Sequence, residues 1–430
     1  MSRLVVTGGH PLVGTCPVQG SKNVALHLYA AALLMRGPVT IHNAPAITDT
    51  AVCVEIATHL GAQAGYVGTD FHVTPPARLG DSIPAELGRR IRPTACFGAA
   101  VLASTGRIWF PLPGGDAFCD RPIGLHLTAM ANAGATVENR HGGVDVRLTD
   151  ARPKAFSMSL NTPFGPSLGA TVTALFMAVR ANGTSVLEDI SVEPEVLHTV
   201  DFLNSAGARI ELLPGNRAEI TGVDELGHAD CTVPADRLEV GTIAIAAAIT
   251  GGQVLLTDTR RADLTPGFLD CVEAIGMVLH DQPDGLFVRM DDEIRPGEVV
   301  TGPHPEFPTD LQPQATTLLT QANGTSQVVE RVYQQRATHT PGLRAFGADI
   351  EQEGNRLKIS GPTAFTAADV EGNDIRCVTA LVLAALAARG ESRIAGLYHL
   401  ARGYGALVPK LIALGAEITF VENDPGMIAP

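Results

Sequence analysis

The most regular feature of this 430-residue chain is an apolar, helix-like stretch that ends in glycine and is followed by a strand-like segment. It occurs six times, and successive glycines are 68 to 73 residues apart. Glycine suits the end of a helix because the residue there often has a positive φ angle, at which a Cβ atom is costly. Six copies in phase indicate six repeats of one supersecondary unit. The copies are Leu60-Gly61-Ala62, Ala133-Gly134-Ala135, Ala206-Gly207-Ala208, Ile275-Gly276-Met277, Phe346-Gly347-Ala348 and Leu414-Gly415-Ala416.

A second glycine follows an Ala/Leu-rich run in each copy, 23 to 28 residues before the glycine described above. This interval has room for a strand, a loop and another helix. In the fifth copy, segments 348–351 and 356–360 flank Gly354-Asn355, which is typical of a hairpin turn. Each unit is therefore predicted to contain helix, strand, helix and a strand pair. The second glycines are Gly37, Gly106, Gly183, Gly252, Gly324 and Gly390.

Six units in a chain of this length favour two domains of three units each. By the phase of the repeat, the first domain covers residues 22–232, and the second covers residues 1–21 together with 233–430. The chain then crosses between the domains twice, near 20–22 and near 232–234. Such a double linker is a natural hinge.

The first 21 residues have no unit of their own. They contain strand-like segments at Leu4–Thr7 and around Pro17-Val18. We expect this leading segment to complete the sheet of the sixth unit. The predicted fold class is thus α/β, with six repeated units of the βαβαββ type.

Composition and charge argue against several classes of function. The formal charge is −14 and no run of lysine or arginine occurs, which argues against a nucleic-acid partner. The seven cysteines include no Cys-x-x-Cys pair, which argues against a disulfide framework or zinc knuckle and fits a reducing cytoplasm. No apolar run approaches the roughly 18 residues that span a bilayer, and the N-terminus does not resemble a signal peptide. We therefore expect a cytoplasmic protein without a membrane partner.

Segment 111–122 has the most unusual composition in the chain. Three prolines, two glycines, two aspartates and one arginine lie within it, so it is predicted to be a loop that interrupts the second unit. A long polar loop in a compact repeat is often a binding loop or a lid. The alternative is a mobile connector.

A second candidate for chemistry is Gly20-Ser21-Lys22-Asn23, at the start of an Ala/Leu-rich helix. A helix N-terminus and an ammonium group both suit an anionic ligand. The alternative is a solvated lysine, because the upstream glycine spacing of a P-loop is lacking. The sequence has no Gly-x-Gly-x-x-Gly, His-Glu-x-x-His or Gly-x-Ser-x-Gly motif, which disfavours nicotinamide and metal chemistry.

Three further segments combine charged residues with helix starts or strand ends. Asp310 follows a proline turn, where a carboxylate can simply cap a helix. Asp374-Ile375-Arg376 opens the first helix of the last unit, and Arg402-Gly403-Tyr404 follows a strand of that unit. These arginines are expected to meet the other candidates only if the two domains face each other.

Together these segments closely resemble the enolpyruvyl transferases, and within them the UDP-N-acetylglucosamine 1-carboxyvinyltransferases of peptidoglycan synthesis. The matching motifs occur in family order over essentially the whole chain. The resemblance implies two domains, each an inside-out α/β barrel with helices buried inside and sheets outside, and closure of the domains over the substrates. The motifs are Gly8-Gly9, Gly20-Ser21-Lys22-Asn23, Pro113-Gly114-Gly115, Arg121-Pro122, Leu125-His126, Ser167 to Thr171, Glu193-Pro194-Glu195, Phe307 to Gln312, Asp374-Ile375-Arg376 and Arg402-Gly403-Tyr404.

The family reaction moves the enolpyruvyl group of phosphoenolpyruvate onto a hydroxyl of a uridine nucleotide and releases phosphate. The resemblance implies that Lys22, Arg92, Arg121 and Arg402 bind phosphoenolpyruvate, which is a co-substrate, so that no cofactor and no obligate protein partner are expected. The resemblance also implies that Asp310 handles the proton of the acceptor hydroxyl and that Asn23 helps to orient the reacting groups. Arg376 is implied to act in closure and in contact with an anion. The other substrate-binding residues that it implies are Pro122, Ile123, Leu125, His126, Ser167, Leu168, Gly169, Glu193 and Val332.

Position 116 is informative, because most relatives carry a cysteine there and this chain has Asp116. A carboxylic acid can deliver a proton to the C3 methylene of the donor, but it is a poor thiolate-type nucleophile. We therefore expect resistance to fosfomycin, an epoxide that alkylates the cysteine of those relatives. Cys119, three residues further on, is interpreted as a loop thiol that Arg121 could make reactive.

Several acceptor-side positions depart from the peptidoglycan enzymes, whereas the phosphoenolpyruvate set is nearly intact. UDP-N-acetylglucosamine, used in the first committed step of peptidoglycan synthesis, is the leading acceptor. The first alternative is a paralogue that uses UMP or a related nucleotide in nucleoside antibiotic synthesis, and the second is a non-catalytic nucleotide-binding regulator. The shikimate-pathway relatives fit less well, because their Ser and Arg after Gly-Ser-Lys are Asn23 and Leu26 here. The departures are Gly124, Gly165, Pro166, Val192, Gln334 and Ala401.

Overall fold

The computed structural model describes residues 3–116, 118–119, 121–291 and 293–421. The contacts between residues divide the chain into two units. Unit 1 consists of Met1–Gln19, Asp116–Cys119 and Ala235–Pro430, and unit 2 consists of Gly20–Gly115 and Asp120–Pro234.

The third copy in unit 2 shows the repeat in full. Two parallel strands, β9 and β12, are joined by the helix α6, and α7 then leads into an antiparallel hairpin whose second strand, β14, pairs with β12. The predicted βαβαββ unit is thereby confirmed. Its elements are β9 (Ser157–Ser159), α6 (Leu168–Ala178), β12 (Thr184–Glu188), α7 (Pro194–Ser205), β13 (Arg209–Leu213) and β14 (Arg217–Thr221).

The rest of unit 2 forms the first and second copies and a small separate hairpin. The sheets have the strand orders β15-β3-β5-β4 and β6-β8-β7, and the hairpin is β10-β11. The elements are α1 (Lys22–Ala32), β3 (Val39–His42), α2 (Thr48–His59), β4 (Gln63–Val67), β5 (Asp70–Thr74), α3 (Ala85–Gly88), α4 (Thr94–Thr105), β6 (Arg107–Pro111), α5 (Gly124–Asn132), β7 (Ala135–Arg140), β8 (Gly143–Leu148), β10 (Asn161–Thr162), β11 (Gly165–Pro166) and β15 (Cys231–Thr232).

Unit 1 contains the last three copies, with sheets β17-β18-β16-β2, β19-β20-β22-β21 and β23-β24-β1-β25. In the described residues each sheet is open. The elements are β1 (Arg3–Thr7), β2 (Val13–Pro17), α8 (Arg237–Ile249), β16 (Gln253–Thr257), the 3-10 turn η1 (Arg261–Asp263), α9 (Pro266–Ala274), β17 (Met277–Gln282), β18 (Gly285–Met290), β19 (Glu298–Val300), the 3-10 turn η2 (Thr309–Leu311), α10 (Gln312–Leu319), β20 (Gly324–Val329), α11 (Thr340–Ala345), β21 (Asp349–Glu353), β22 (Arg356–Gly361), β23 (Asp369–Glu371), α12 (Ile375–Ala387), β24 (Glu391–Ala395), α13 (Leu397–Gly403), α14 (Leu407–Ala413) and β25 (Glu417–Val421).

The two N-terminal strands belong to different sheets. β1 lies between β24 and β25 in the sheet of the sixth copy, as predicted. For β2 the prediction is wrong, because β2 pairs in parallel with β16 in the sheet of the fourth copy. Only Cys16 of β2 is buried, so its sequence carries almost no pattern that could specify a partner strand.

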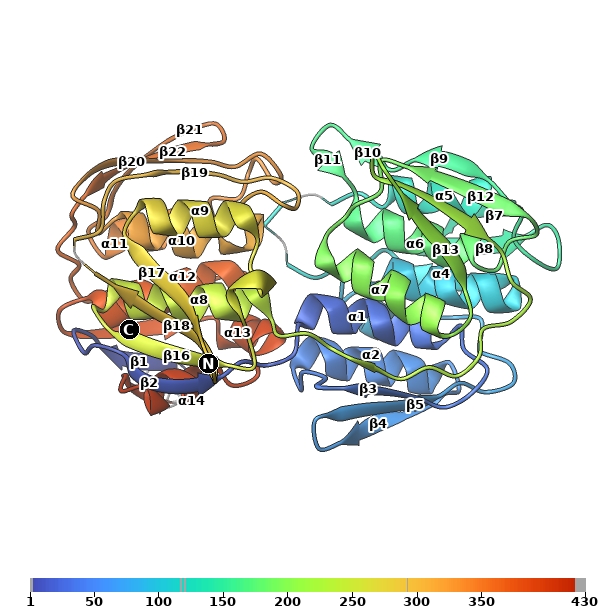
Figure 1. The fold of residues 1–430 in the computed structure, drawn as a ribbon, viewed down its shortest axis with the longest axis horizontal. Coiled ribbons are helices and arrows are strands. Elements are labelled where there is room, and N and C mark those ends of the chain that lie inside the picture. The colour runs from blue at the N-terminus through green and yellow to red at the C-terminus, as the bar shows by residue number, and fades with distance from the viewer. Residues whose placement is uncertain (1–2, 117, 120, 292, 422–430) are drawn as a thin grey trace, which may run out of the picture. The chain divides into compact units, whose positions relative to one another are not determined.

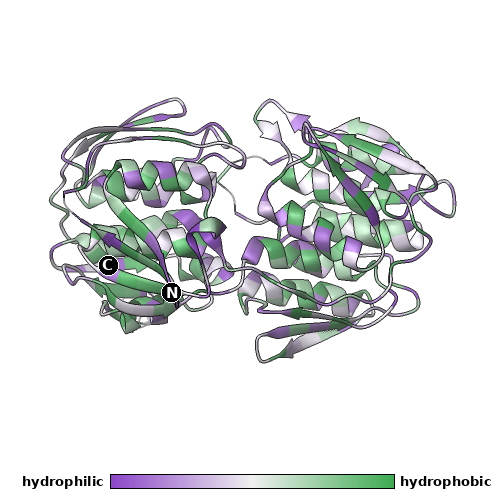
Figure 2. Cartoon of the chain, in the orientation of Figure 1, coloured by the Kyte–Doolittle hydropathy of each residue, from purple (hydrophilic) through white to green (hydrophobic). Residues whose placement is uncertain are grey.

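Within each unit the first helix of each copy lies at the centre, and the strands lie around these helices (Figure 1). The central helices are α1, α4 and α6 in unit 2 and α8, α10 and α12 in unit 1. All of α10 and all but one residue of α8 and of α12 are buried, and these three helices contact one another in unit 1. In Figure 2 the inner helices carry many hydrophobic residues, with polar ones among them. Helices that are buried on all sides, including the polar side chains of α10, are surrounded by protein, and the sheets cover them from outside. The predicted inside-out α/β arrangement is confirmed.

The glycines that defined the repeat have the conformation expected of them. All six that precede Ala or Met have φ between +93° and +109°. Of the second set, Gly37 and Gly252 are exceptions without positive φ. A Cβ atom on Gly252 would lie 2.0 Å from the backbone oxygen of Leu12, so this glycine is needed for the close approach of two chain segments.

Apart from the short stretch Asp116–Cys119, the chain passes between the units at 19–20 and at 234–235. Backbone hydrogen bonds join the two passages: the N–H of Ser21 donates to Pro234 at 2.8 Å, and the N–H of Asp236 donates to Gln19 at 2.8 Å. The hinge remains a prediction.

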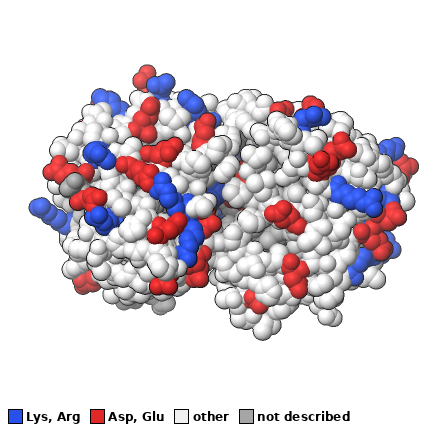
Figure 3. Space-filling model, in the orientation of Figure 1, with Lys and Arg blue, Asp and Glu red and all other residues white. Residues whose placement is uncertain are grey.

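No helix in the described part of the chain is long and apolar enough to cross a membrane. On the face drawn in Figure 3, acidic and basic side chains are interspersed on both units.

Candidate active site

Lys22 is held at the N-terminus of α1. Ser21 caps this helix, and the Nζ atom of Lys22 lies 2.9 Å from Oδ2 of Asp49 in α2. Both side chains are buried. A cation at a helix N-terminus opposes the helix dipole, so an anion must compensate it. Lys22 is therefore not the solvated lysine of the alternative interpretation. Asn23, the next residue, is half-buried.

The loop end that carries Arg121 is tied to the segment before α4. The Nη2 atom of Arg92 donates to the backbone oxygen of Pro122 at 3.3 Å. Ile123 is buried directly after it, and α5 begins at the next residue. The described residues between β6 and α5 form no regular element, as predicted for segment 111–122.

His126 joins α5 to the N-terminus of α6. Its Nδ1 lies 2.7 Å from Oγ1 of Thr173, and its Cε1 would lie 2.9 Å from a Cβ on Gly169. Burial, together with the charges of Arg92 and His27, lowers the pKa of His126 to about 3. The imidazole is therefore neutral at physiological pH, and it can hydrogen-bond a ligand without adding charge.

Unit 2 thus holds twelve of the predicted site residues, most of them at helix starts. Ser167 caps α6 and is followed by Leu168, while Glu193 precedes α7. Helix N-termini present unpaired backbone N–H groups, which suit phosphate and carboxylate ligands. The twelve are Lys22, Asn23, Arg92, Arg121, Pro122, Ile123, Leu125, His126, Ser167, Leu168, Gly169 and Glu193.

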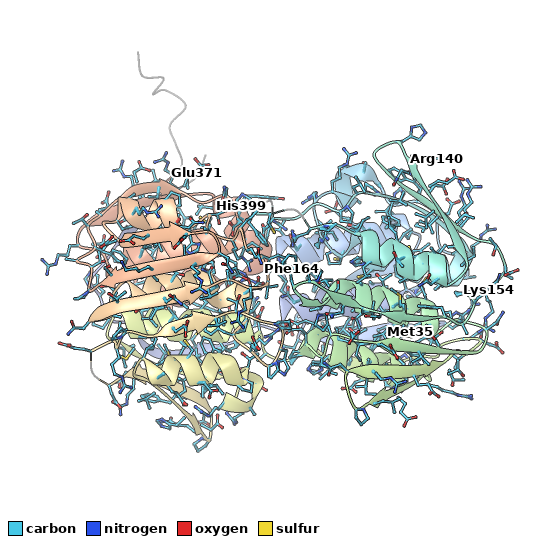
Figure 4. The ribbon with its side chains drawn as sticks, turned by 90° about the horizontal axis from the view of Figure 1, so that it is seen from above. Met35, Arg140, Lys154, Phe164, Glu371 and His399 are labelled. Carbon is cyan, nitrogen blue, oxygen red and sulfur yellow. The ribbon has the colours of Figure 1, made fainter. Side chains whose placement is uncertain are left out.

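Asp116 belongs to unit 1 by its contacts, although it lies in the loop between two elements of unit 2. Its Oδ1 is ion-paired with Nη1 of Arg402 in α13, whose side chain is buried. Nδ1 of His399, a residue labelled in Figure 4, lies 3.8 Å from the same oxygen. The structure therefore joins two residues predicted to be catalytic. Arg402 itself lies within the helix α13, which follows the strand β24.

Asp310 is held by two arginines rather than capping a helix. Its Oδ2 lies 2.7 Å from Arg376, and its Oδ1 lies 2.8 Å from Arg336. Burial raises the pKa of Asp310, but the two guanidinium groups outweigh this effect and hold it well below its ordinary value. The carboxylate is therefore ionised and is a weak base as long as both arginines remain in place.

Arg376 links this carboxylate to the last copy. Asp374 caps α12 by accepting the N–H of Arg376 at 2.9 Å, which confirms that this segment opens a helix. Nη1 of Arg376 donates to the hydroxyl of Tyr404 at 2.8 Å, and this hydroxyl lies 3.0 Å from Oγ1 of Thr242. The guanidinium of Arg376 is thus held by the carboxylate of Asp310 and by the hydroxyl of Tyr404.

Arg336 is a residue that sequence reasoning missed. Besides Asp310 it donates to Oγ1 of Thr309 at 2.8 Å, and that hydroxyl donates to Oε2 of Glu330 at 2.9 Å. Oε1 of Glu330 accepts the N–H of Val332, a predicted substrate-binding residue, at 2.9 Å. Arg336 lies in an irregular segment without a motif, so its role follows only from its contacts. Asp49 in α2 and His399 in α13 also belong to no motif, and their roles likewise follow only from their contacts.

The described residues contain no group of three or more His, Cys, Asp or Glu side chains that could hold a metal ion.

Comparison with known proteins identifies the family. The model of the family "EPSP synthase (3-phosphoshikimate 1-carboxyvinyltransferase)" matches residues 6–411. The chain belongs to the enolpyruvyl transferase family. It is an enzyme that transfers enolpyruvyl (1-carboxyvinyl) groups, as predicted.

Relatives of this enolpyruvyl transferase cover it almost completely. UDP-N-acetylglucosamine 1-carboxyvinyltransferase 1 of Halalkalibacterium halodurans is 36% identical, over 97% of this chain and 94% of that protein. UDP-N-acetylglucosamine 1-carboxyvinyltransferase of Chlorobaculum parvum is 36% identical, over 97% of this chain and 98% of that protein. Among solved structures, the enolpyruvyl transferase NikO from Streptomyces tendae has a TM-score of 0.87 and 27% identity, over 97% of this chain and 98% of that chain.

Proposed function

We propose that this enolpyruvyl transferase uses phosphoenolpyruvate as donor and a hydroxyl of UDP-N-acetylglucosamine as acceptor, with release of phosphate. The observation that carries the proposal is the identity of 36% with proteins of that named activity, over 97% of the chain. We place the reaction in the cytoplasm, where reduced cysteines are the rule.

The addition step needs a proton at the C3 methylene of the donor, cations around its carboxylate and phosphate, and an acceptor for the proton of the attacking hydroxyl. In our proposal Asp116 delivers the first proton. Lys22, Arg92, Arg121 and Arg402 bind the donor anion. The contact between Asp116 and Arg402 supports this division, because it places the carboxyl group beside a donor-binding cation. The carboxylate must take up a proton before it can act as the acid.

Asp310 is proposed to take the proton of the acceptor hydroxyl. Its lowered pKa makes it a poor base toward a free alcohol. The hydroxyl becomes strongly acidic only as its oxygen bonds to C2 of the donor. We therefore propose that Asp310 first orients the hydroxyl and receives its proton late, as the C–O bond forms.

The second candidate acceptor is UMP or a related uridine nucleotide. Gly124 stands where the peptidoglycan enzymes usually have an aspartate, and a Cβ atom there would meet no atom within 4 Å, so the space for that side chain is empty of protein. Val192, in place of an arginine, packs instead against the apolar core of unit 2. Both departures remove groups that a larger acceptor would use.

Phosphate release from phosphoenolpyruvate, measured with UDP-N-acetylglucosamine, UMP and uridine in parallel, tests these proposals. Fastest release with UDP-N-acetylglucosamine, together with a carboxyvinyl product found by mass spectrometry, would support the leading proposal. Faster release with UMP would replace it by the second candidate. Binding of a nucleotide without release would leave the non-catalytic regulator as the interpretation.

A further inference from the structure

Phe118 anchors the loop between β6 and α5 to the rest of unit 1 at a second place, besides the ion pair of Asp116. The ring of Phe118 packs edge-on against Tyr333, with centroids 5.1 Å apart and planes at 77°. Cζ of Arg336 lies 4.2 Å from the centre of the Phe118 ring and 5.4 Å from that of Tyr333. Phe118 is buried even though it lies in a polar loop.

Arg336 is therefore enclosed by two kinds of contact. The aromatic rings of Phe118 and Tyr333 contact its guanidinium, while Asp310 and Thr309 accept its hydrogen bonds. Only 4% of Arg336 is exposed. A guanidinium attracts an aromatic face more strongly when water is excluded, and it also attracts a carboxylate more strongly there. The Phe118 ring thus affects how firmly Arg336 holds Asp310.

We propose that Phe118 is a positioning residue that fixes the Asp116–Cys119 segment on unit 1 and, through Arg336, fixes the carboxylate of Asp310. The catalytic part of this inference depends on the role proposed above for Asp310. The anchoring part does not depend on it, so the two parts are tested by separate measurements.

Cys119 provides the readout for anchoring, because it lies next to Phe118 and is only half-buried. Burial raises the pKa of the other six thiols, so they react slowly with alkylating reagents. The pKa is about 11 for Cys16 and about 12 for Cys96, Cys231, Cys271 and Cys377, and that of Cys53 is also raised.

The first experiment measures iodoacetamide labelling of Cys119 by peptide mass spectrometry, relative to the same variant in denaturant. In Phe118→Ala we expect Cys119 to be labelled about 3- to 10-fold faster than in the wild type. In Phe118→Tyr its labelling rate should stay within about twofold of the wild-type rate. Phe118→Leu tests whether the aromatic ring, rather than the volume of the side chain, is needed. Cys119 in this variant should be labelled nearly as fast as in Phe118→Ala. The matched control is Phe420→Ala, which removes an exposed phenylalanine of β25 and should change nothing.

Equal labelling of Phe118→Ala and the wild type would overturn the anchoring. If Cys119 is labelled in Phe118→Leu at the wild-type rate, the role proposed for the aromatic ring is overturned. Arg336→Lys keeps the charge but loses the planar face, so it provides a second test on the other partner. It should also label faster, and a wild-type rate there would contradict the stack.

The second experiment measures phosphate release. Phe118→Ala should lower kcat by about 3- to 10-fold with little change in KM for the donor, and Phe118→Tyr should restore kcat. Faster labelling of Cys119 with unchanged kcat would overturn the catalytic part and leave the anchoring intact. If the wild type releases no phosphate with any acceptor, the proposed function fails, while the labelling result still decides the anchoring.

Discussion

Asp116 and Arg402 form a partly buried ion pair in unit 1, although 286 residues separate them in the sequence. The pair joins the residue that stands in place of a cysteine to an arginine expected to bind the donor. Replacing either partner removes the opposite charge that this pair places beside the other, at a site where both side chains are largely shielded from water.

Asp116→Ala is therefore expected to lower kcat for phosphate release by about 100-fold or more, because both the acid and the partner of Arg402 are lost. Arg402→Ala should have an effect of similar size. In the double variant the losses should be far from additive, since the residues act as a unit. Steady-state kinetics of the four proteins measures this, and strictly additive losses would show that the pair has no joint role.

The native enzyme is expected to resist fosfomycin, because the residue at position 116 is a carboxylate. Asp116→Cys should become sensitive and form a stoichiometric adduct at that position. Intact-mass and peptide mass spectrometry detect the adduct. A stoichiometric adduct on the native protein would contradict the prediction, and its location would show whether Cys119 has become the target.

Lys22→Ala should mainly weaken binding of phosphoenolpyruvate, because it removes an ammonium fixed at a helix N-terminus. It also removes the ammonium that lies 2.9 Å from the buried carboxylate of Asp49, and breaking a buried ion pair typically costs about 3 kcal/mol or more. The variant Lys22→Ala/Asp49→Ala separates the two effects, since it should regain stability but not donor affinity. Calorimetric titration and urea unfolding measure the two quantities. Recovery of donor affinity in the double variant would argue against a binding role for Lys22.

Gln19 is expected to position Arg402. Its side chain donates to the oxygen of Gly403 at 3.1 Å and accepts the N–H of Gly405 at 3.3 Å, and thereby holds the end of α13. Gln19→Ala should raise KM for the donor by about 5- to 10-fold through loss of these two bonds. Gln63→Ala, at an exposed position of β4, is the control. An unchanged KM would mean that α13 holds Arg402 without this support.

Stability is expected to fall in mild acid because of His339, whose pKa burial lowers to about 3. Between that value and about 6.5 the unfolded chain binds a proton that the folded protein does not bind, so unfolding becomes easier as pH falls. Each such histidine contributes a slope of about 1.4 kcal/mol per pH unit. Urea unfolding at several pH values measures the slope. His339→Gln should reduce it, whereas the exposed His10→Gln should not, and equal slopes would refute the assignment.

The repeat was predictable because its signal is local. Three adjacent residues are enough to indicate a glycine with positive φ at the end of an apolar helix, as at Gly61 and Gly415. The structure confirms this conformation in each copy. Asp374 as a helix cap was predictable for the same reason. These features need no knowledge of distant contacts.

The contacts of the candidate site were not predictable in this way. Asp310 looked like a helix cap, but its carboxylate is held by Arg376, 66 residues later, and by Arg336. The partner of β2 was missed because its sequence has only one buried position. Ion pairs between distant segments depend on the tertiary arrangement, and a single sequence does not encode them as a spacing.

The strands β1 and β2, near the start of the sequence, belong to two sheets whose remaining strands are made from residues 369–421 and 253–290. During synthesis on the ribosome, all residues of unit 2 emerge before either set of partners exists. β2 must therefore wait, unpaired, until β16 has been made, and β1 must wait until β24 and β25 have been made. Deleting β25 would strip β1 of one of its two neighbours, so damage at the very end of the chain would be felt at its beginning.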